Sequence, residues 1–285
     1  MSLLDFLLNW SNMVPSASSQ AHCAACGGPI LKSCLTALGQ TWHPEHFCCG
    51  VCHRPLTGQF SLSRHREPFC NLHSQNQVLC QCCGHLILGT QATGEFCAAC
   101  RTDIPQDAKV LEPLLTGIQA RLRNEGLPWW PQSFPLRLVA PDEMKISKPQ
   151  KGAPLAPLAG LIRKVSTSDA KGRPMRSVPE IRLLRGRPSL MQGAVIAHEL
   201  GHAWIFQKGI CDLPADLEEG FCEFCSYLWI SSSNDPRAAY QMERIALNPD
   251  PTYGGGFRKI RDLGGKRGLP GVLDGLAALN KGSQT

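Results

Sequence analysis

The residues of this chain best suited to chemistry lie in positions 197–204, with the sequence Ala-His-Glu-Leu-Gly-His-Ala-Trp. His198 and His202 stand four residues apart, with Glu199 between them. On a helix such residues share a face, so both imidazoles could bind one zinc ion while Glu199 reaches a water on that metal. The spacing therefore predicts a zinc-dependent hydrolytic site in which Glu199 is the general base.

A third metal ligand must be something other than histidine, because residues 101–285 contain no histidine outside that pair. Glu219 follows His202 after sixteen intervening residues, enough for an antiparallel second helix. We predict that Glu219 is the third ligand, and that Glu223, one turn further on, accepts a hydrogen bond from a ligand histidine. Glu218 points about 100° away and is the weaker choice, since an acidic residue at a helix start is ordinary.

Two helices and a small sheet must position these residues. For the first helix, the sequence predicts Ser189 as the N-cap, Gln192 as the partner in a capping box, and Gly209 as the stop. The second helix should begin near Pro214. An amphipathic helix is expected over residues 107–125. Three runs are typical of strands: residues 134–140, 159–166 and 179–185.

Metal-ligand residues are dense in the N-terminal third. From Cys23 to His73 they follow Cys-x2-Cys-x16-His-x2-His-x2-Cys-x2-Cys-x17-Cys-x2-His, which is two groups of four, each able to fill a tetrahedral zinc shell. CxxC pairs alternating with histidines favour zinc over a disulfide framework or a redox role. With Trp-His-Pro-Glu-His-Phe at positions 42–47, the series resembles a LIM domain. The resemblance implies that Cys23, Cys26, His43 and His46 hold one zinc, and that Cys49, Cys52, Cys70 and His73 hold another.

A further four-cysteine pattern follows the LIM-like series. Cys80, Cys83, Cys97 and Cys100 form two CxxC knuckles and predict a third structural zinc. These three shells are closed, so they stabilise the fold, whereas two histidines and Glu219 leave a position open for water. We therefore expect four zinc ions, three structural and one catalytic.

The catalytic pattern is similar to that of gluzincin peptidases, which implies that an edge strand, here residues 179–185, aligns the substrate. Taken with Leu-Glu-Glu-Gly-Phe-Cys at 217–222 and Tyr-Gly-Gly-Gly-Phe-Arg at 253–258, the chain resembles the ubiquitin-activated LIM-domain zinc metallopeptidases that restrict organ growth in plants (the DA-one family). Its length fits a shortened or bacterial relative. The resemblance implies protein substrates, among them ubiquitin or ubiquitinated proteins.

A hydrogen-bond donor for the developing oxyanion must come from a tyrosine or an arginine, because no spare histidine exists in this half. Tyr253 and Arg258 are the candidates. A tight turn at Gly254–Gly256 is the simpler explanation of that motif.

We expect an α+β chain in which residues 1–20 form an N-terminal tail. Residues 21–75 form the LIM domain, 76–104 a LIM-like, zinc-ribbon-like module, and 105–285 a gluzincin-like peptidase domain with a small sheet and active-site helices. The expected function is endopeptidase activity on proteins, with the LIM region recruiting or regulating the substrate. The alternative is a LIM adaptor whose peptidase domain is catalytically silent or autoinhibited.

Composition limits the compartment and the partners. The sequence shows neither a signal peptide nor a membrane span, so we expect a cytoplasmic protein with no membrane partner. The net charge is +6, and residues 163–187 hold eight Lys or Arg against two Asp or Glu. Without a DNA-reading motif or interleaved aromatic residues, this favours a solvated strand face or acidic partners over nucleic acid.

Overall fold

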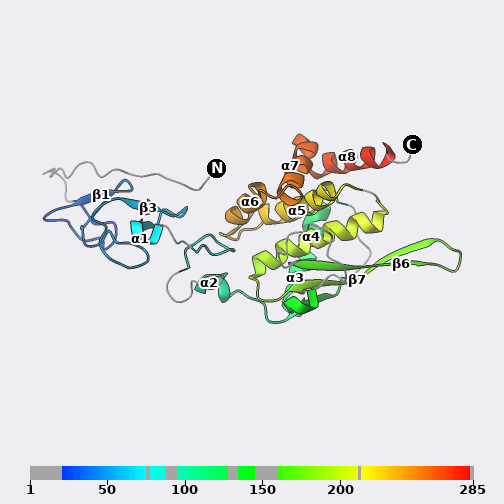
Figure 1. Cartoon of the computed structure of the whole chain (residues 1–285), viewed down its shortest axis with the longest axis horizontal. Coiled ribbons are helices and arrows are strands. Elements are labelled where there is room, and N and C mark those ends of the chain that lie inside the picture. The colour runs from blue at the N-terminus through cyan, green and yellow to red at the C-terminus, as the bar shows by residue number, and fades with distance from the viewer. Residues whose placement is uncertain are drawn as a thin grey trace. The chain divides into compact units, whose positions relative to one another are not determined.

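The chain forms two compact units, Met1–Ala98 and Ala99–Thr285. The computed structural model describes residues 21–74, 78–87, 95–127, 134–144, 159–210 and 213–282 (Figure 1). The tail predicted over residues 1–20 lies outside these ranges. Short hairpins in the first unit and a small sheet with helices in the second make this an α+β protein.

In its described residues, the first unit contains mainly short hairpins. Its regular elements are β1 (Leu35–Ala37), β2 (Gln40–Trp42), β3 (Phe60–Leu62), β4 (Pro68–Cys70) and α1 (Asn71–Ser74). Strand β1 pairs antiparallel with β2, and β3 with β4. One buried cluster of this unit consists of Leu35, Phe47, Cys49, Leu56 and Phe69. A small domain buries a small share of its surface, so metal ions bound to its side chains would add to its stability.

The second unit contains most of the regular structure. In chain order after α2 (Ala98–Arg101), it comprises a 3₁₀ helix (Ala108–Leu111), α3 (Glu112–Asn124), β5 (Leu136–Val139), a 3₁₀ helix (Pro141–Met144), β6 (Gly160–Ser168), β7 (Pro174–Leu184), α4 (Ser189–Lys208), α5 (Ala215–Ser231), α6 (Ala238–Ala246), α7 (Tyr253–Gly264), a 3₁₀ helix (Gly265–Arg267) and α8 (Leu269–Gly282). The helix predicted over residues 107–125 and the three predicted strands are therefore confirmed, with shifted ends.

The three strands form one mixed sheet in the order β5-β7-β6. Strand β7 pairs parallel with β5 and antiparallel with β6. The prediction that residues 179–185 form an edge strand is wrong, because they belong to β7, which is central. The central position of β7 depends on its pairing with β5 on one side and with β6 on the other, and no local sequence pattern specifies the pairing with β5.

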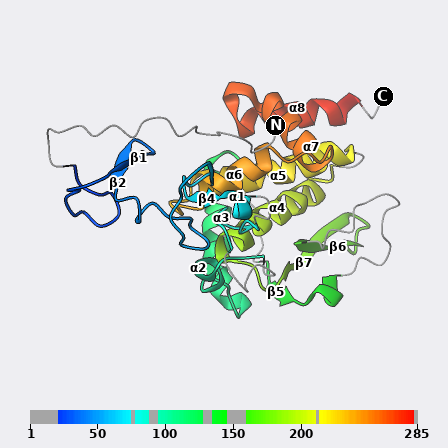
Figure 2. The same ribbon diagram turned by 60° about the vertical axis from the view of Figure 1, so that its left-hand side comes forward.

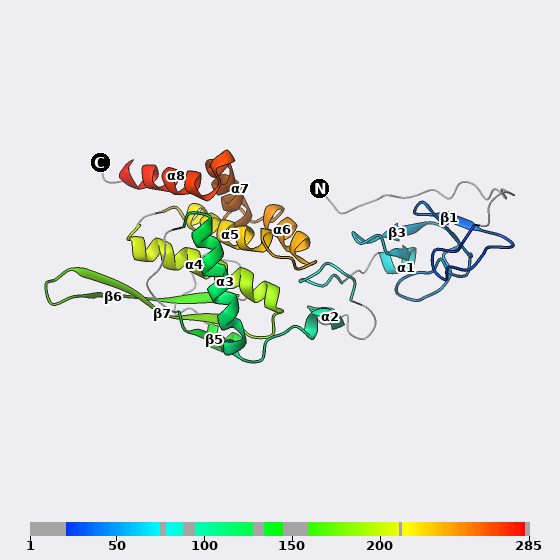
Figure 3. The ribbon, with the colours of Figure 1, turned by 180° about the vertical axis from the view of Figure 1, so that it is seen from behind.

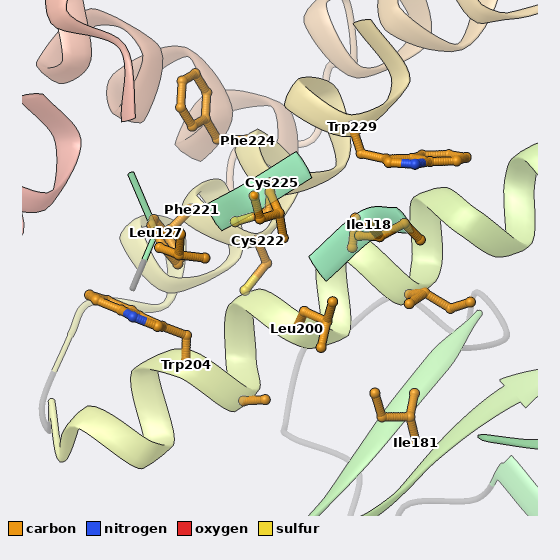
Figure 4. Close-up of a cluster of buried hydrophobic side chains, with 14 of the residues drawn as sticks. Ile118, Leu127, Ile181, Leu200, Trp204, Phe221, Cys222, Phe224, Cys225 and Trp229 are labelled. Atoms are coloured by element: carbon orange, nitrogen blue, oxygen red, sulfur yellow. The ribbon is translucent and has the colours of Figure 1, made fainter. Parts of the chain in front are cut away.

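The helices stack outward from one face of the sheet. Helix α4 packs on β6 and β7, α5 on α4, α7 on α5, and α8 on α7 (Figures 1 and 2). Helix α3 crosses α4, as the view from behind shows (Figure 3). Figure 4 shows Leu200 and Trp204 of α4 directed toward Cys222 and Phe221 of α5, in the main hydrophobic core of the unit.

Glycines allow α4, α5 and α7 to approach closely. A Cβ on Gly201 of α4 would lie 2.9 Å from Cys222 Sγ on α5. A Cβ on Gly220 of α5 would meet the backbone of Gly256 on α7. Side chains at these positions would push the helices apart, so the glycines set the spacing on which the site described below depends.

The ends of α4 agree only in part with the helix ends predicted from the sequence. Gly209 ends the helix in a left-handed conformation (φ 68°), which confirms the predicted stop. The capping box is wrong, because Pro188 is the N-cap and both polar side chains bind elsewhere: Ser189 Oγ donates to Asp103 O, and Gln192 Nε2 donates to Leu184 O. These bonds tie the start of α4 to its neighbours instead. Helix α5 begins directly after Pro214, as predicted.

Candidate functional site

Three groups of four Cys and His residues lie in the first part of the chain. In each group the potential ligand atoms lie within 4.8 Å of one another: Cys23, Cys26, His43 and His46; Cys49, Cys52, Cys70 and His73; and Cys80, Cys83, Cys97 and Cys100. The groups match the sequence-based sets in every member. They support zinc binding in this region.

The distances within the groups fit tetrahedral zinc. Zn–S bonds of about 2.3 Å and Zn–N bonds of about 2.1 Å place S and N about 3.6 Å apart, two N about 3.4 Å apart and two S about 3.8 Å apart. Cys23 Sγ lies 3.5 Å from His46 Nδ1, and His43 Nδ1 lies 3.3 Å from His46 Nδ1. Cys83 Sγ lies 3.7 Å from Cys97 Sγ. The side chains are thus already spaced as ligands of a shared ion.

In each group the pKa of one cysteine is lowered, which favours its thiolate form. Burial raises the pKa of Cys23, Cys49 and Cys80, but hydrogen bonds, mainly from backbone N–H groups, outweigh it and hold these pKa values at about 5, 6 and 7. Because the thiolate is the metal-binding form, this electrostatic environment favours zinc.

A separate cluster lies between α4 and α5 in the second unit. His198 and His202 occupy successive turns of α4. Glu219 Oε2 lies 3.2 Å from His198 Nε2 and 3.5 Å from His202 Nε2. Tetrahedral N and O ligands at about 2.1 Å would be about 3.4 Å apart. Glu219 Oε2 therefore lies at the spacing of a zinc ligand from both Nε2 atoms, and each of the three side chains is between 14% and 23% exposed.

A carboxylate contacts the Nδ1 atom of each histidine, on the side of the ring away from Nε2. His198 Nδ1 lies 3.2 Å from Glu223 Oε1, which is the contact predicted for Glu223. His202 Nδ1 lies 2.9 Å from Glu218 Oε1, a contact that the sequence reasoning missed. Together they direct both Nε2 atoms inward and keep the outer nitrogens protonated, which increases the basicity of the ligands.

The acidic surroundings also shift the ionisation of the site. Burial lowers the pKa of His198, but Glu219 and Glu223 outweigh it and raise that pKa well above its usual value. Burial raises the pKa of Glu219, yet the two histidines hold it far below its usual value. The carboxylates thus favour a positive charge between the two helices, which a bound cation would supply.

Cys222 is a second possible partner of the histidine pair. Its Sγ lies within 4.8 Å of a ring nitrogen of both His198 and His202. However, the side chain is fully buried against Gly201, and burial raises its pKa well above its usual value. Glu219 fits a metal better, because it is ionised and partly accessible, and its carboxylate oxygen contacts both Nε2 atoms.

Glu199 lies on the sheet side of this cluster. It is 5% exposed, and burial raises its pKa, against the opposing effect of His198 and His202. A Cβ on Gly160, the first residue of β6, would lie 2.6 Å from Glu199 Oε1 and would also meet Val195 Cγ1. Gly160 therefore leaves the space that the Glu199 carboxylate occupies. The only signal of this role in the sequence is a glycine at the start of a strand.

Tyr253 approaches the site from α7. Its ring is stacked near that of His198, with the centroids 6.4 Å apart. Burial, with the charges of Glu219 and Glu223, raises the pKa of Tyr253 to about 12, so its hydroxyl keeps its proton and remains a donor. The expected tight turn at Gly254–Gly256 is wrong: Tyr253 begins α7, and Asp250 Oδ1 accepts hydrogen bonds from the N–H groups of Thr252 and Tyr253.

Arg258, the other candidate donor, has a different set of contacts. Its Nη1 donates to Ala246 O at 3.1 Å and to Asn248 O at 3.0 Å. These bonds satisfy carbonyls at the end of α6 and attach α7 to it. A catalytic role for Arg258 stays a prediction.

Comparison with known proteins identifies two regions. Residues 23–78 match the LIM domain family, and residues 143–241 match a DA1-like family described as Protein DA1. The second match contains the two histidines and the three glutamates of the cluster. The chain thus carries an N-terminal LIM domain and a DA1-like region.

Three relatives match parts of this chain. LIM domain-containing protein HDR3 of Oryza sativa subsp. japonica is 22% identical over 76% of this chain and 59% of its own length. Protein DA1-related 1 of Arabidopsis thaliana is 26% identical over 75% of this chain and 52% of its own length. Paxillin-B of Dictyostelium discoideum is 40% identical over 24% of this chain and 12% of its own length. The chain spans at most about three fifths of these relatives.

Proposed function

We propose that this chain is a zinc-dependent endopeptidase whose LIM region recruits or regulates protein substrates. The observation that supports the proposal is that Glu219 Oε2 lies at ligand spacing from both His198 Nε2 and His202 Nε2, with the Glu199 carboxylate buried beside them. Two histidines and one carboxylate leave a coordination position open, as a catalytic zinc requires. Among the described residues, no helix is both long and apolar enough to cross a membrane.

Each residue of the cluster would have its own role in peptide hydrolysis. His198, His202 and Glu219 would hold the zinc, which when bound polarises a carbonyl and lowers the pKa of a water. The Glu199 carboxylate would accept the proton of the attacking water and return it to the nitrogen of the leaving amine. Its raised pKa suits a base that must also act as an acid.

Supporting residues would orient these groups. Glu223 and Glu218 keep the protons of the outer histidine nitrogens in place, so both Nε2 lone pairs face inward. The Tyr253 hydroxyl, whose pKa is raised to about 12, would donate to the oxyanion that forms as the carbonyl is attacked. The sequence resemblance alone suggests ubiquitin or ubiquitinated proteins as partners.

The second candidate is an adaptor whose DA1-like region is catalytically silent. Three closed four-ligand groups in the N-terminal part favour it, because they suffice for a protein-binding role without any catalytic metal. Zinc analysis separates the two ideas. Four zinc ions per chain are expected for the peptidase, and the double variant His198→Ala/His202→Ala should lose one of them. Three ions in the unmodified chain would favour the adaptor.

The peptidase proposal is tested by comparing new peptide termini in cells that produce the normal chain or the Glu199→Gln variant. The variant keeps all zinc ligands but lacks the base. We expect new termini only with the normal chain, at equal zinc content of both. The same termini with both chains would remove Glu199 from the mechanism, and no new termini with either would favour the adaptor.

A further inference from the structure

The β6-β7 hairpin offers an open strand edge beside Glu199. Strand β6 pairs with β7 on one side, and among the described strands it has no partner on the other. The hairpin projects beyond the end of α4 (Figures 1 and 3). An open edge of this kind can bind an extended peptide through main-chain hydrogen bonds.

The register shows which backbone groups face outward. Leu184 N–H donates to Ala159 O, and Ile162 stands opposite Ile181 in the antiparallel pair. Bonded and non-bonded pairs alternate along an antiparallel ladder, so Gly160 and Ile162 are non-bonded positions. Ile181 N–H accordingly donates away from β6, to Pro135 O. The N–H and C=O groups of Gly160 and Ile162 therefore point to the open edge, next to Glu199.

A β-bulge follows these two residues. Arg163 stands opposite Glu180 and Val165 opposite Ser177, so β7 carries the extra residue, opposite Lys164. Along β6 itself, Lys164 keeps the two-residue alternation of Gly160 and Ile162 and therefore lies on the same face of the sheet as they do. Here Lys164 Nζ lies 3.5 Å from Glu218 Oε1 and 5.9 Å from the centre of the Phe206 ring, so its side chain is directed to the face that carries α4 and α5.

The Lys164 ammonium has capacity for a further partner. Its side chain is 39% exposed, and an ammonium has three donors, of which Glu218 takes one. Glu218 is itself engaged with His202 Nδ1 at 2.9 Å. Arg176 adds positive charge nearby, because its guanidinium lies against Gly209 at the C-terminal end of α4, and it stands opposite Ser166 in the hairpin.

We infer that the β6 edge selects an extended peptide segment with acidic side chains, held at Lys164. This inference rests on the proposed peptidase function and names the class of substrate it favours. Gly160 and Lys164 are four residues apart, so a paired peptide covers the distance of about 13 Å between them with about four residues. The preferred acidic residue therefore lies within about four residues of the cleaved bond, on one side of it.

The test measures binding separately from cleavage. The full-length, zinc-loaded Glu199→Gln chain is titrated into labelled extended peptides of equal length that carry a run of Glu, Gln or Lys, and the dissociation constants are read by fluorescence anisotropy. The Glu peptide should bind tightest. Lys164→Ala, made in the same background, should weaken its binding about twofold to fivefold, and more salt should reduce the preference. Lys164→Glu should reverse it.

Lys109→Glu is the matched control. Lys109 is exposed on the 3₁₀ helix that packs near β5, at the opposite edge of the sheet, and the substitution makes the same change in charge. It should leave the preference unchanged. Three results would overturn the inference. The Glu and Gln peptides could bind equally well, the Glu peptide could fail to bind, or Lys164→Glu and Lys109→Glu could have equal effects. Since Glu199→Gln is not expected to cleave, a failure of the peptidase proposal would instead appear as missing cleavage by the normal chain.

Discussion

Replacing Gly160 with alanine should reduce catalysis far more than stability. The new Cβ would lie 2.6 Å from Glu199 Oε1 and 3.0 Å from Glu199 Cγ, and would also meet Val195 Cγ1. All of these atoms belong to side chains, which can shift more easily than backbone. Both Val195 and Glu199, the proposed general base, must shift.

The size of the effect follows from these distances. Ordinary contact begins near 3.4 Å, so the Glu199 carboxylate must retreat by about 0.8 Å. A displacement of about 1 Å in a catalytic group costs about 100-fold in rate. Overpacking a core position costs about 1–3 kcal/mol of unfolding free energy, and flexible side-chain ends favour the lower part of that range.

The assay compares the cleavage rate of a substrate identified from its new termini with the urea midpoint and the zinc content of the same preparations. Gly117→Ala is the control: Gly117 lies within α3, and a Cβ there would have no atom within 4 Å. This control should gain about 0.5–1 kcal/mol of stability and cleave normally. If Gly160→Ala cleaves as fast as the control with its fold intact, the placement of Glu199 as the base is refuted.

Three further substitutions have defined outcomes. Glu223→Gln should weaken zinc binding at the α4-α5 site about 10-fold to 100-fold in a chelator competition, because the acceptor of the His198 Nδ1–H loses its negative charge; unchanged affinity would contradict that role. Tyr253→Phe should lower kcat about 100-fold with KM and zinc content little changed, whereas an unaltered kcat would exclude Tyr253 as the oxyanion donor. Hydrogen bonds from Arg237 lower the pKa of Asp235, so the stabilisation they give is present above the unfolded pKa of about 3.9 and is lost as the pH falls through the folded value. Asp235→Asn should therefore lower the urea midpoint at about pH 7, with the difference from the normal chain vanishing in acid; a constant difference would argue against this ion pair.

The sequence was sufficient to predict most of the residues that the Cys and His groups and the α4-α5 cluster bring together. Ligand spacing depends on local geometry, so the three Cys and His groups and the i, i+4 histidine pair could be read directly. The absence of further histidines in residues 101–285 left a carboxylate or a more distant group as the proposed third ligand, and helical periodicity selected Glu219 and Glu223.

The contacts that depend on how elements cross could not be predicted in this way. Glu218 was set aside because it points about 100° from Glu219 on an isolated helix. Helices α4 and α5 run antiparallel, however. His198 contacts Glu223, so His202, one turn further along α4, contacts a residue nearer the start of α5, which is Glu218. The edge position of β6 and the contact of Gly160 with Glu199 likewise arise from strand order, which pairing over long sequence separation determines.

The ligand set of the α4-α5 cluster is tested most directly by anomalous X-ray scattering at the zinc edge from crystals of the zinc-loaded chain. We expect a peak about 2.1 Å from Nε2 of His198, Nε2 of His202 and the carboxylate of Glu219, with a water beside Glu199 as the fourth ligand. Peaks only at the three N-terminal groups, or a zinc bound to Cys222 Sγ in place of Glu219, would contradict it.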